Sequence, residues 1–391
     1  MLNVPFSPWP SFTQEESNAV SSVLISNRVN YWTGQEGRLF EEEFAAWSGC
    51  EYAIALANGT VAIDAALIAL GVGEGDEVIV TSRTFIASVS SVVSSGAIPI
   101  FADVDSDSQN ITAESISRVL SKKTKAIICV HLAGWPCDMD SIMELATDNG
   151  IYVIEDCAQA HGAKYKGNPV GSIGHIAAWS FCQDKIMSTG GEGGMVATNE
   201  QSLWSKMWSY KDHGKSWEAV YEREHPPGFR WLHDSFGTNW RMTEMQAAIG
   251  RVQLKRMCDW SKKRRCNAKV IWKCGLQFDA LRIPYIPDYI EHAAYKCYFF
   301  VREDKLSAGW SRDRIMNEII KLGVPCFSGS CSEVYLEKAF DNTGWRPKVR
   351  LPVAKKLGET SLMFLVHPTL TPDEIDLTTE AIRKVMLEAS I

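Results

Sequence analysis

Short apolar runs alternate with segments of helix length between residues 50 and 200. A spacing of roughly 20–30 residues between such runs is typical of βαβ units, which build a parallel sheet with helices on both faces. The sequence therefore predicts an α/β fold with a mainly parallel sheet, in which a glycine-rich turn separates the last two strands. The runs expected to form strands are residues 52–56, 77–80, 98–101, 126–130, 151–154, 176–181 and 194–198.

The length of the chain and a change of pattern after residue 250 indicate two domains. At roughly 150 residues per domain, a chain of 391 residues allows two or three units. Beyond residue 250 the sequence has a basic helical run at 255–265, a strand-like run at 297–301 and a closing helical pattern near 375–387. We therefore expect a large domain at residues 1–255 and a smaller α+β domain at residues 256–391.

Charge and hydrophobicity exclude several classes of protein. Hydrophobic residues make up 46% of the chain and charged residues 22%, which is typical of a globular protein. The 40 basic and 47 acidic side chains leave a net charge of -7, so no overall field attracts nucleic acid or an anionic membrane. Residues 84–102 are uncharged, but Gly96, Pro99 and several serines divide them into a helix and a strand, so no membrane span is expected.

The cysteines and the first residues bear on the compartment. Eleven cysteines are scattered along the chain without a C-x-x-C pair, which argues against a disulfide framework and against a zinc site. No basic segment leads an apolar run in residues 1–10, so no secretory signal is predicted. We expect a cytoplasmic protein with reduced thiols and no metal ligands.

The ends of the predicted strands are the places to look for chemistry, because helix N-termini and loops meet at the carboxyl edge of an open parallel sheet. Asn58, Gly59 and Thr60 follow the first predicted strand, and a helix begins at once. Free backbone N–H groups, the helix dipole and the Thr60 hydroxyl suit a phosphate group. An ordinary helix cap uses the same residue types, so this segment alone leaves both interpretations open.

Two more strand ends carry ionisable groups. Glu155 and Asp156 follow a buried strand, and a buried carboxylate needs a cation from a ligand or from a structural Arg or Lys. Lys185 lies between another strand and a glycine-rich turn, which suits a flat or anionic ligand, although a solvated lysine is the commoner case. No phosphate-binding G-x-x-x-x-G-K-[ST] loop is present. Together, a phosphate site, a buried acid and a lysine are the groups that hold pyridoxal phosphate (PLP).

The motifs around these residues resemble the PLP-dependent sugar aminotransferases of the DegT/StrS family, which have the aspartate-aminotransferase fold (fold type I). The resemblance extends over most of the chain and is densest at residues 28–255. It implies a large PLP-binding α/β domain followed by a smaller α+β domain. The segments that carry it are NGT (58–60), TFIA (84–87), VHLAG (130–134), IEDCAQA (154–160), SF (180–181) with Lys185, GEGG (191–194) and NWRMTE (239–244).

The resemblance also implies the roles of individual residues. Lys185 forms the Schiff base with the cofactor and Asp156 faces its ring nitrogen, so both are implied to be catalytic. In relatives, the asparagine that matches Asn239 reaches the phosphate of the neighbouring subunit's cofactor, which implies a homodimer with shared active sites. The other implied cofactor contacts are Phe85 against the ring, Gln159 near its hydroxyl, and Gly59, Thr60 and Ser180 at its phosphate.

The reactants follow from the same resemblance. Glutamate is the implied amino donor, and the acceptor is a keto-deoxysugar linked to dTDP, UDP or GDP. We expect a 4-keto-6-deoxyhexose, aminated for a surface polysaccharide such as the O-antigen of lipopolysaccharide or for another glycosylated product. Two alternatives stay open, namely the same chemistry on a 3-keto sugar and a non-catalytic PLP-binding regulator or scaffold.

The acceptor contacts are less well defined. A basic and aromatic segment at residues 213–233 has the composition to stack a base and meet a diphosphate, or its aromatic residues pack against the domain. The segment around Ser328 departs from the proline-and-histidine pattern often present in that region of relatives, so the sugar stays undefined. The residues expected to bind the acceptor are His213, Lys215, Trp217, Tyr221, Arg230 and Ser328.

Two other activities occur on related sequences or on the same fold. Members of the family that remove oxygen from sugars have histidine in place of the lysine, whereas this chain has Lys185. Cysteine desulfurases need a nucleophilic cysteine on a mobile loop, and Cys326 and Cys331 are the candidates for that role. Because the sugar-type motifs are otherwise complete, transamination is the expected activity.

Overall fold

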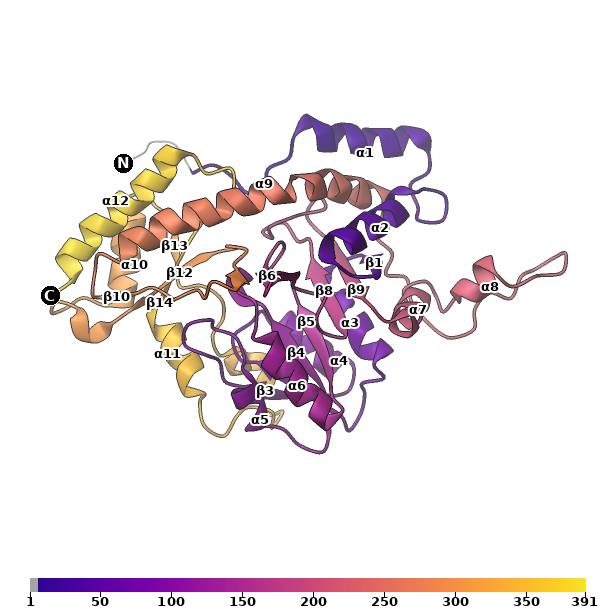
Figure 1. Ribbon diagram of the computed structural model, residues 1–391, viewed down its shortest axis with the longest axis horizontal. Coiled ribbons are helices and arrows are strands. Elements are labelled where there is room, and N and C mark those ends of the chain that lie inside the picture. Colours follow the sequence, from indigo (N-terminus) through magenta and orange to yellow (C-terminus); the bar gives the residue numbers. More distant parts are fainter. Residues whose placement is uncertain (1–5) are drawn as a thin grey trace.

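A seven-stranded sheet in the order β1-β9-β8-β5-β4-β2-β3 forms the centre of the computed structural model (Figure 1), which describes residues 6–391. β9 is antiparallel to its neighbours β1 and β8, and the remaining pairs are parallel, so the predicted α/β fold is confirmed. Residues 1–5, at the start of the predicted large domain, lie outside the described residues. The strands are β1 (Tyr52–Leu56), β2 (Glu77–Thr81), β3 (Ile98–Ala102), β4 (Thr124–Val130), β5 (Tyr152–Asp156), β8 (Ile176–Ser180) and β9 (Gly194–Thr198).

Helices cover both faces of this sheet, because successive strand residues point to opposite faces. On one face, Ile54 and Ile128 pack with α3, α4 and α7. On the other face, Ala55 and Ile127 belong to the clusters formed with α2, α5, α6 and the first part of α9. The helices are α1 (Gln14–Ser26), α2 (Glu36–Ser48), α3 (Gly59–Ala69), α4 (Ala87–Ser94), α5 (Ala113–Ser117), α6 (Met139–Asn149), α7 (Gln201–Tyr210) and α9 (Glu244–Gly275).

The C-terminal part is built on a second, antiparallel sheet in the order β10-β12-β14-β13. Its core is shared with α10, α12 and the second half of α9. The predicted strand at 297–301 and the closing helix near 375–387 are confirmed as β12 and α12. The elements are β10 (Leu281–Arg282), β12 (Cys297–Val301), β13 (Cys326–Phe327), β14 (Ser361–Phe364), α10 (Arg312–Lys321), α11 (Pro352–Thr360) and α12 (Pro372–Ala389).

The long helix α9 runs along both sheets (Figure 1), and residue 255 lies inside it. The division of the chain at this residue stays a prediction. Other segments also join the two parts. Val334 and Phe340 pack into the core of the central sheet, and a small sheet pairs β6 (Lys164–Tyr165) with β7 (Asn168–Pro169) and β11 (Ile290–Glu291).

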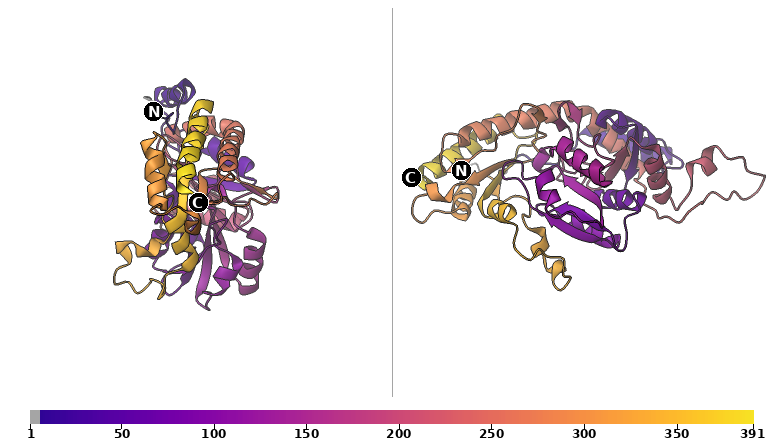
Figure 2. Two further views of the ribbon diagram at one scale, coloured as in Figure 1. Left: turned by 90° about the vertical axis from the view of Figure 1, so that its left-hand side faces the viewer. Right: turned by 60° about the horizontal axis from the view of Figure 1, so that its bottom comes forward.

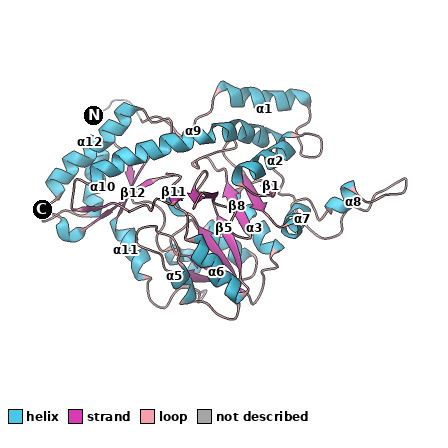
Figure 3. Cartoon of the chain, in the orientation of Figure 1, coloured by secondary structure: helices cyan, strands magenta, loops and turns pink. Residues whose placement is uncertain are grey.

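A segment between α7 and α9 projects away from the rest of the molecule and carries the short helix α8 (Trp217–Tyr221), as Figure 2 shows. Figure 3 shows that most of this segment is loop. Short 3-10 helices lie at Leu132–Gly134, Glu303–Lys305, Val334–Leu336 and Lys338–Phe340. Within residues 6–391, no helix is both long and apolar enough to span a membrane.

Candidate active site

A cavity of about 1080 Å³ opens beside the carboxyl ends of β1, β5 and β8, where the sequence placed the chemistry. It is also lined by residues of α3, α4 and the C-terminal part of the chain. The structure therefore brings together residues that are far apart in the sequence. The predicted cofactor residues that line this cavity are Gly59, Thr60, Phe85, Asp156, Gln159, Ser180 and Lys185.

The N-terminus of α3 forms one end of the cavity. The Asn58 side chain caps the helix by accepting a hydrogen bond from the Val61 N–H at 3.0 Å. The first N–H groups of a helix, here those of Gly59 and Thr60, have no partner within the helix and are free for an anion. Glycine is required at position 59 because a Cβ there would lie 2.6 Å from the Ser180 Cβ. These residues form a cradle of the kind that a phosphate group occupies.

Asp156, at the end of β5, is a buried carboxylate that forms no ion pair with any residue in the described range 6–391. Its Oδ2 accepts a hydrogen bond from the Ser88 hydroxyl at 2.8 Å, and its Oδ1 accepts one from the Ala158 N–H at 3.1 Å. Burial raises the pKa of Asp156 above its ordinary value, although these two hydrogen bonds and the charge of Lys185 act in the opposite direction. A cationic ring nitrogen in this cavity would supply the missing partner.

Lys185 lies in the same cavity as Asp156, on the loop that follows β8. Its Nζ lies 3.7 Å from Asp184 Oδ1 and 5.5 Å from the centre of the Tyr295 ring. The Trp9 indole N–H donates a hydrogen bond to the Lys185 carbonyl oxygen at 2.7 Å, which fixes the loop from the side of the N-terminal segment. The amine therefore faces the cavity close to one carboxylate.

Phe85 and Gln159 line the same cavity as Asp156. The Phe85 side chain is 66% exposed and lines the cavity, so it is not part of the hydrophobic core. A flat apolar face of this kind suits an aromatic ring. Gln159 is held by the Ala133 N–H, which donates to its Oε1 at 2.8 Å. Both side chains line the cavity that contains Asp156 and Lys185.

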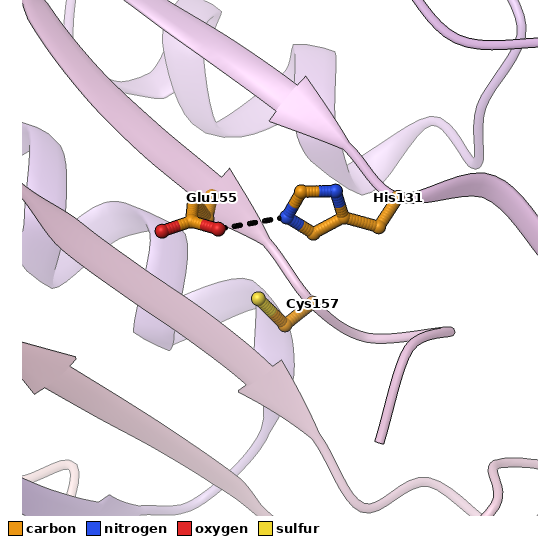
Figure 4. A group of neighbouring side chains, drawn as sticks. All are labelled: His131, Glu155 and Cys157. Carbon is orange, nitrogen blue, oxygen red and sulfur yellow. Dashed lines mark hydrogen bonds and ion pairs between the residues drawn. The ribbon is translucent and has the colours of Figure 1, made fainter. Parts of the chain in front are cut away.

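Glu155, the neighbour of Asp156, points to the opposite face of the sheet and has a structural role. Its carboxylate accepts hydrogen bonds from the N–H groups of Gly171, Ile173 and Gly174 at 2.6–2.9 Å and lies 2.9 Å from His131 Nε2 (Figure 4). Burial acts to raise the pKa of Glu155, but the hydrogen bond from His131 and those from the backbone outweigh it and lower this pKa. The sequence reasoning left open which of the two acids is buried, and the structure buries both.

His131, Glu155 and Cys157 lie close enough to one another to suggest a metal site (Figure 4). The His131 Nδ1 accepts a hydrogen bond from the Cys137 N–H at 2.9 Å, so the ring proton is on Nε2 and donates to Glu155. The remaining oxygen of Glu155 is occupied by backbone N–H groups. Because the lone pairs of His131 and Glu155 already accept hydrogen bonds, we interpret His131 and Glu155 as a structural hydrogen-bond network that links the ends of β4 and β5, and not as metal ligands.

Replacing Glu155 with glutamine is expected to destabilise the protein. The amide N–H₂ would face backbone N–H groups, and leaving such buried donors unpaired costs about 1–3 kcal/mol. Because the pKa of Glu155 is lowered by folding, its contribution is present at pH 7 and is lost as the pH falls below the ordinary glutamate range. The measurement is chemical denaturation of wild type and Glu155→Gln at pH 7, and equal free energies of unfolding would contradict this account.

The predicted acceptor residues lie outside the cavity within this chain. Trp217 packs against Trp204 and Tyr221, with ring centroids 5.2 and 4.3 Å apart. Lys215 Nζ lies 3.2 Å from Asp212 Oδ1. His213 and Arg230 lie on the projecting segment. Ser328 does not line the cavity, but its neighbours Phe327 and Gly329 do, and its carbonyl oxygen accepts a hydrogen bond from Ser361. Asn239, predicted to contact the cofactor of a neighbouring subunit, is exposed at the end of the projecting segment. Their roles stay predictions.

The structure adds residues that the sequence reasoning missed. Ser88 comes directly after the TFIA motif. Its spacing of four residues from Thr84, one turn of a helix, is the signal that could have identified it. The Thr84 and Ser88 hydroxyls lie 2.9 Å apart. Asp184 precedes Lys185 directly. Tyr295 and Lys296 come from a segment more than one hundred residues away, and no local pattern links them to the site. Tertiary contacts alone identify these two.

Comparison of the chain with known proteins identifies its family. The model of the DegT/DnrJ/EryC1/StrS aminotransferase family matches residues 10–383. The chain belongs to this family. The protein is a PLP-dependent sugar aminotransferase of fold type I. The resemblance seen in the sequence is confirmed.

Three relatives illustrate the range of the family. The crystal structure of an aminotransferase from Psychrobacter cryohalolentis is 67% identical, covers 98% of this chain and 99% of its own, and has a TM-score of 0.97. A GDP-perosamine synthase of Escherichia coli O157:H7 is 43% identical over 68% of this chain and 69% of its own length. A UDP-N-acetyl-3-dehydro-alpha-D-glucosamine 3-aminotransferase of Acidithiobacillus ferrooxidans is 34% identical over 93% and 92%.

The cavity fits the PLP that this family uses. The cradle at Gly59 and Ser180 can receive the phosphate, and the buried Asp156, which has no ion-pair partner in the part of the chain that the structure describes, could pair with a cationic ring nitrogen. Phe85 offers a flat wall, and Lys185 offers an amine. When bound, the cofactor supplies an electron sink for the carbon that loses a proton.

Proposed function

We propose that this aminotransferase moves the amino group of glutamate to a keto-deoxysugar linked to a nucleoside diphosphate, in the first instance a 4-keto-6-deoxyhexose. The observation that carries the proposal is the presence of Lys185 and Asp156 in one cavity of about 1080 Å³. This volume is larger than a cofactor alone requires. A regulator or scaffold that only binds PLP would not need this additional space.

The names of the relatives support a nucleotide-linked sugar. One relative is named for a GDP-linked product and another for a UDP-linked sugar aminated at carbon 3. The second name favours a second candidate, amination of a 3-keto sugar by the same groups. A product used in a surface polysaccharide and a location in the cytoplasm are parts of the same proposal.

Each residue at the site has a separate role in the proposed reaction. Asp156 holds a proton at the ring nitrogen, because two unit charges about 4 Å apart at an effective dielectric of ~20 attract by about 4 kcal/mol. Lys185 is the base that moves the proton between carbon atoms, and its neighbour Asp184 supplies a counter-charge. Gly59, Thr60 and Ser180 hold the phosphate, so the reacting atoms stay in place while the proton moves.

A homodimer with shared sites is part of the proposal. The projecting segment exposes Phe229, Trp231 and Phe236, of which 73%, 78% and 98% of the surface is open to solvent. Apolar side chains so exposed suit a protein interface. Asn239 at the end of this segment would then lie near the partner's cofactor. Light scattering of the purified protein tests this point, and a monomer at micromolar concentration would contradict it.

The acceptor is tested with keto sugars. The purified, PLP-loaded protein is offered 4-keto-6-deoxyhexoses and 3-keto sugars on GDP, UDP and dTDP, with glutamate present, and formation of 2-oxoglutarate is followed. We expect turnover with one nucleotide and one keto position, at least about tenfold above the others, because unmet polar contacts penalise the wrong sugar. Turnover with the 3-keto sugars alone would favour the second candidate, and no turnover with any of them would refute the proposed function.

A further inference from the structure

A smaller cavity of about 250 Å³ lies beside the active site. Its walls come from the N-terminal segment at residues 6–9, from α9 and from residues 365–367 that follow β14. It shares Asp184, Tyr295 and Lys296 with the larger cavity, so the two spaces are neighbours. Nothing in the reaction described so far uses it.

Arg264 of α9 lines this smaller cavity and forms no ion pair with an acidic residue of the described chain. Its side chain is 1% exposed, and its Nε and Nη2 have no hydrogen-bond partner among the described residues. Its Nη1 makes one long hydrogen bond, 3.5 Å to the Tyr295 carbonyl oxygen, and its guanidinium lies 4.8 Å from the centre of the Trp9 ring. Burial lowers the pKa of Arg264 to about 9. A buried guanidinium with unused donors is costly unless a ligand pairs with it.

Lys296 is a second cation on the same wall. Burial lowers its pKa to about 8, and Arg264 and Lys185 act in the same direction. Asp184 is the acid that lines both cavities, and its Oδ2 already accepts a hydrogen bond from the Tyr295 hydroxyl at 2.5 Å. His367 stacks on Trp9, and burial with the nearby Arg264 and Lys296 lowers its pKa to about 3, so it is neutral. The cavity therefore has an excess of positive charge.

We propose that Arg264 and Lys296 bind a carboxylate group of the amino donor while its amine faces Lys185. This inference rests on the proposed function. The donor is the small reactant that carries carboxylates, and Arg matches a carboxylate with two parallel N–H donors. A space of about 250 Å³ holds the end of an amino acid, whereas a nucleoside diphosphate needs more room. Its place next to Lys185 suits the donor rather than the distant end of a sugar nucleotide.

Binding is tested first without any reaction. Glutarate, a dicarboxylate with no amine, is titrated by calorimetry into PLP-loaded wild type, Arg264→Met, Lys296→Met and Lys263→Met. Lys263 is the exposed neighbour of Arg264 on α9 and is the matched control. We expect the dissociation constant for glutarate to rise at least about tenfold in the first two variants and to stay within twofold in the control. If Arg264→Met and Lys296→Met bound inorganic phosphate more weakly than wild type but bound glutarate as tightly, the assignment would be overturned.

The two half-reactions then separate this inference from the proposed function. Arg264→Met is expected to slow the reaction of the PLP form with glutamate at least about tenfold in kcat/KM. The same variant, reconstituted with pyridoxamine phosphate, should react with the keto sugar within about twofold of wild type. Unchanged reaction with glutamate, or an equal fall in both half-reactions, would overturn the carboxylate site alone. Wild type that binds PLP but does not react with glutamate would refute the proposed function and this inference together.

The melting temperature of each variant is also measured, so that a loss of binding through misfolding can be recognised. Methionine has a similar volume and removes a buried, unpaired charge, so Arg264→Met should melt at the same or a higher temperature in the absence of ligand. Glutarate should then raise the melting temperature of wild type but not of Arg264→Met. A lower melting temperature for the unliganded variant would show that Arg264 serves the fold, and it would count against the proposal.

Discussion

Lys185→Ala is expected to abolish turnover, with a fall of at least about 10³-fold in kcat, because the proposed role of the Lys185 amine is both to bind the cofactor covalently and to move the proton. Lys296 lies in the same cavity, but Lys185 is the one beside Asp184 at 3.7 Å on the loop after β8. Absorbance provides the second readout. Wild type should show a band at about 400–430 nm that shifts on addition of glutamate. The variant should bind PLP without this shift.

The control for this experiment is a lysine away from the site. Lys122 is exposed in the turn before β4, and Lys122→Ala should keep the absorbance band and full turnover. Near-normal turnover of Lys185→Ala would remove Lys185 from the reaction. A colourless wild-type protein after incubation with PLP would contradict the site as a whole.

Asp156→Asn is expected to lower kcat by about 10²–10⁴-fold, because a neutral amide cannot hold the proton on the ring nitrogen. Asparagine has nearly the same shape, and its amide oxygen can still accept the hydrogen bond from Ser88. The loss should therefore appear in kcat rather than in the amount of bound cofactor. A variant with at least half the wild-type kcat would contradict the role of Asp156.

The same substitution should make the stability of the cofactor-free protein less dependent on pH. Burial raises the pKa of Asp156 in the folded state, so the ionised carboxylate opposes folding at neutral pH. This cost is absent below the ordinary pKa of aspartate, appears as the pH rises through the raised value and is constant above it. Asp156→Asn removes this cost, but the Ala158 N–H loses the carboxylate oxygen that accepts its hydrogen bond, and that loss does not depend on pH. In chemical denaturation, the free energy of unfolding of the variant relative to wild type should therefore rise between pH 3 and pH 7, and an equal difference at both pH values would contradict this account.

The centre of the fold and the core of the site follow from the sequence for a physical reason. Strands buried on both faces are continuous apolar runs, so β1, β2, β4 and β5 are visible without any tertiary information. Gly59, Asp156 and Lys185 lie at or shortly after the ends of such runs, and the structure brings all three to one cavity. The resemblance to a family added the roles of these residues.

The remaining parts depend on contacts that no short segment encodes. Lys296 reaches the cavity from the start of β12, and Arg264 reaches the neighbouring space from the middle of a helix whose sequence reads as an ordinary basic surface. Trp217 looked suited to stack a base, but it packs on Trp204 against the core of the central sheet. The assignment of Trp217 to the acceptor would require a neighbouring chain.

The two acids at the end of β5, Glu155 and Asp156, should differ in how well the fold tolerates their substitution. Glu155 is bound by four groups on one face of the sheet, and Asp156 opens into the cavity on the other. A randomised library built over both positions would lose most of its members to misfolding at the first position. Diversifying position 156 alone, with its predecessor fixed, would explore new reactivity on an intact scaffold.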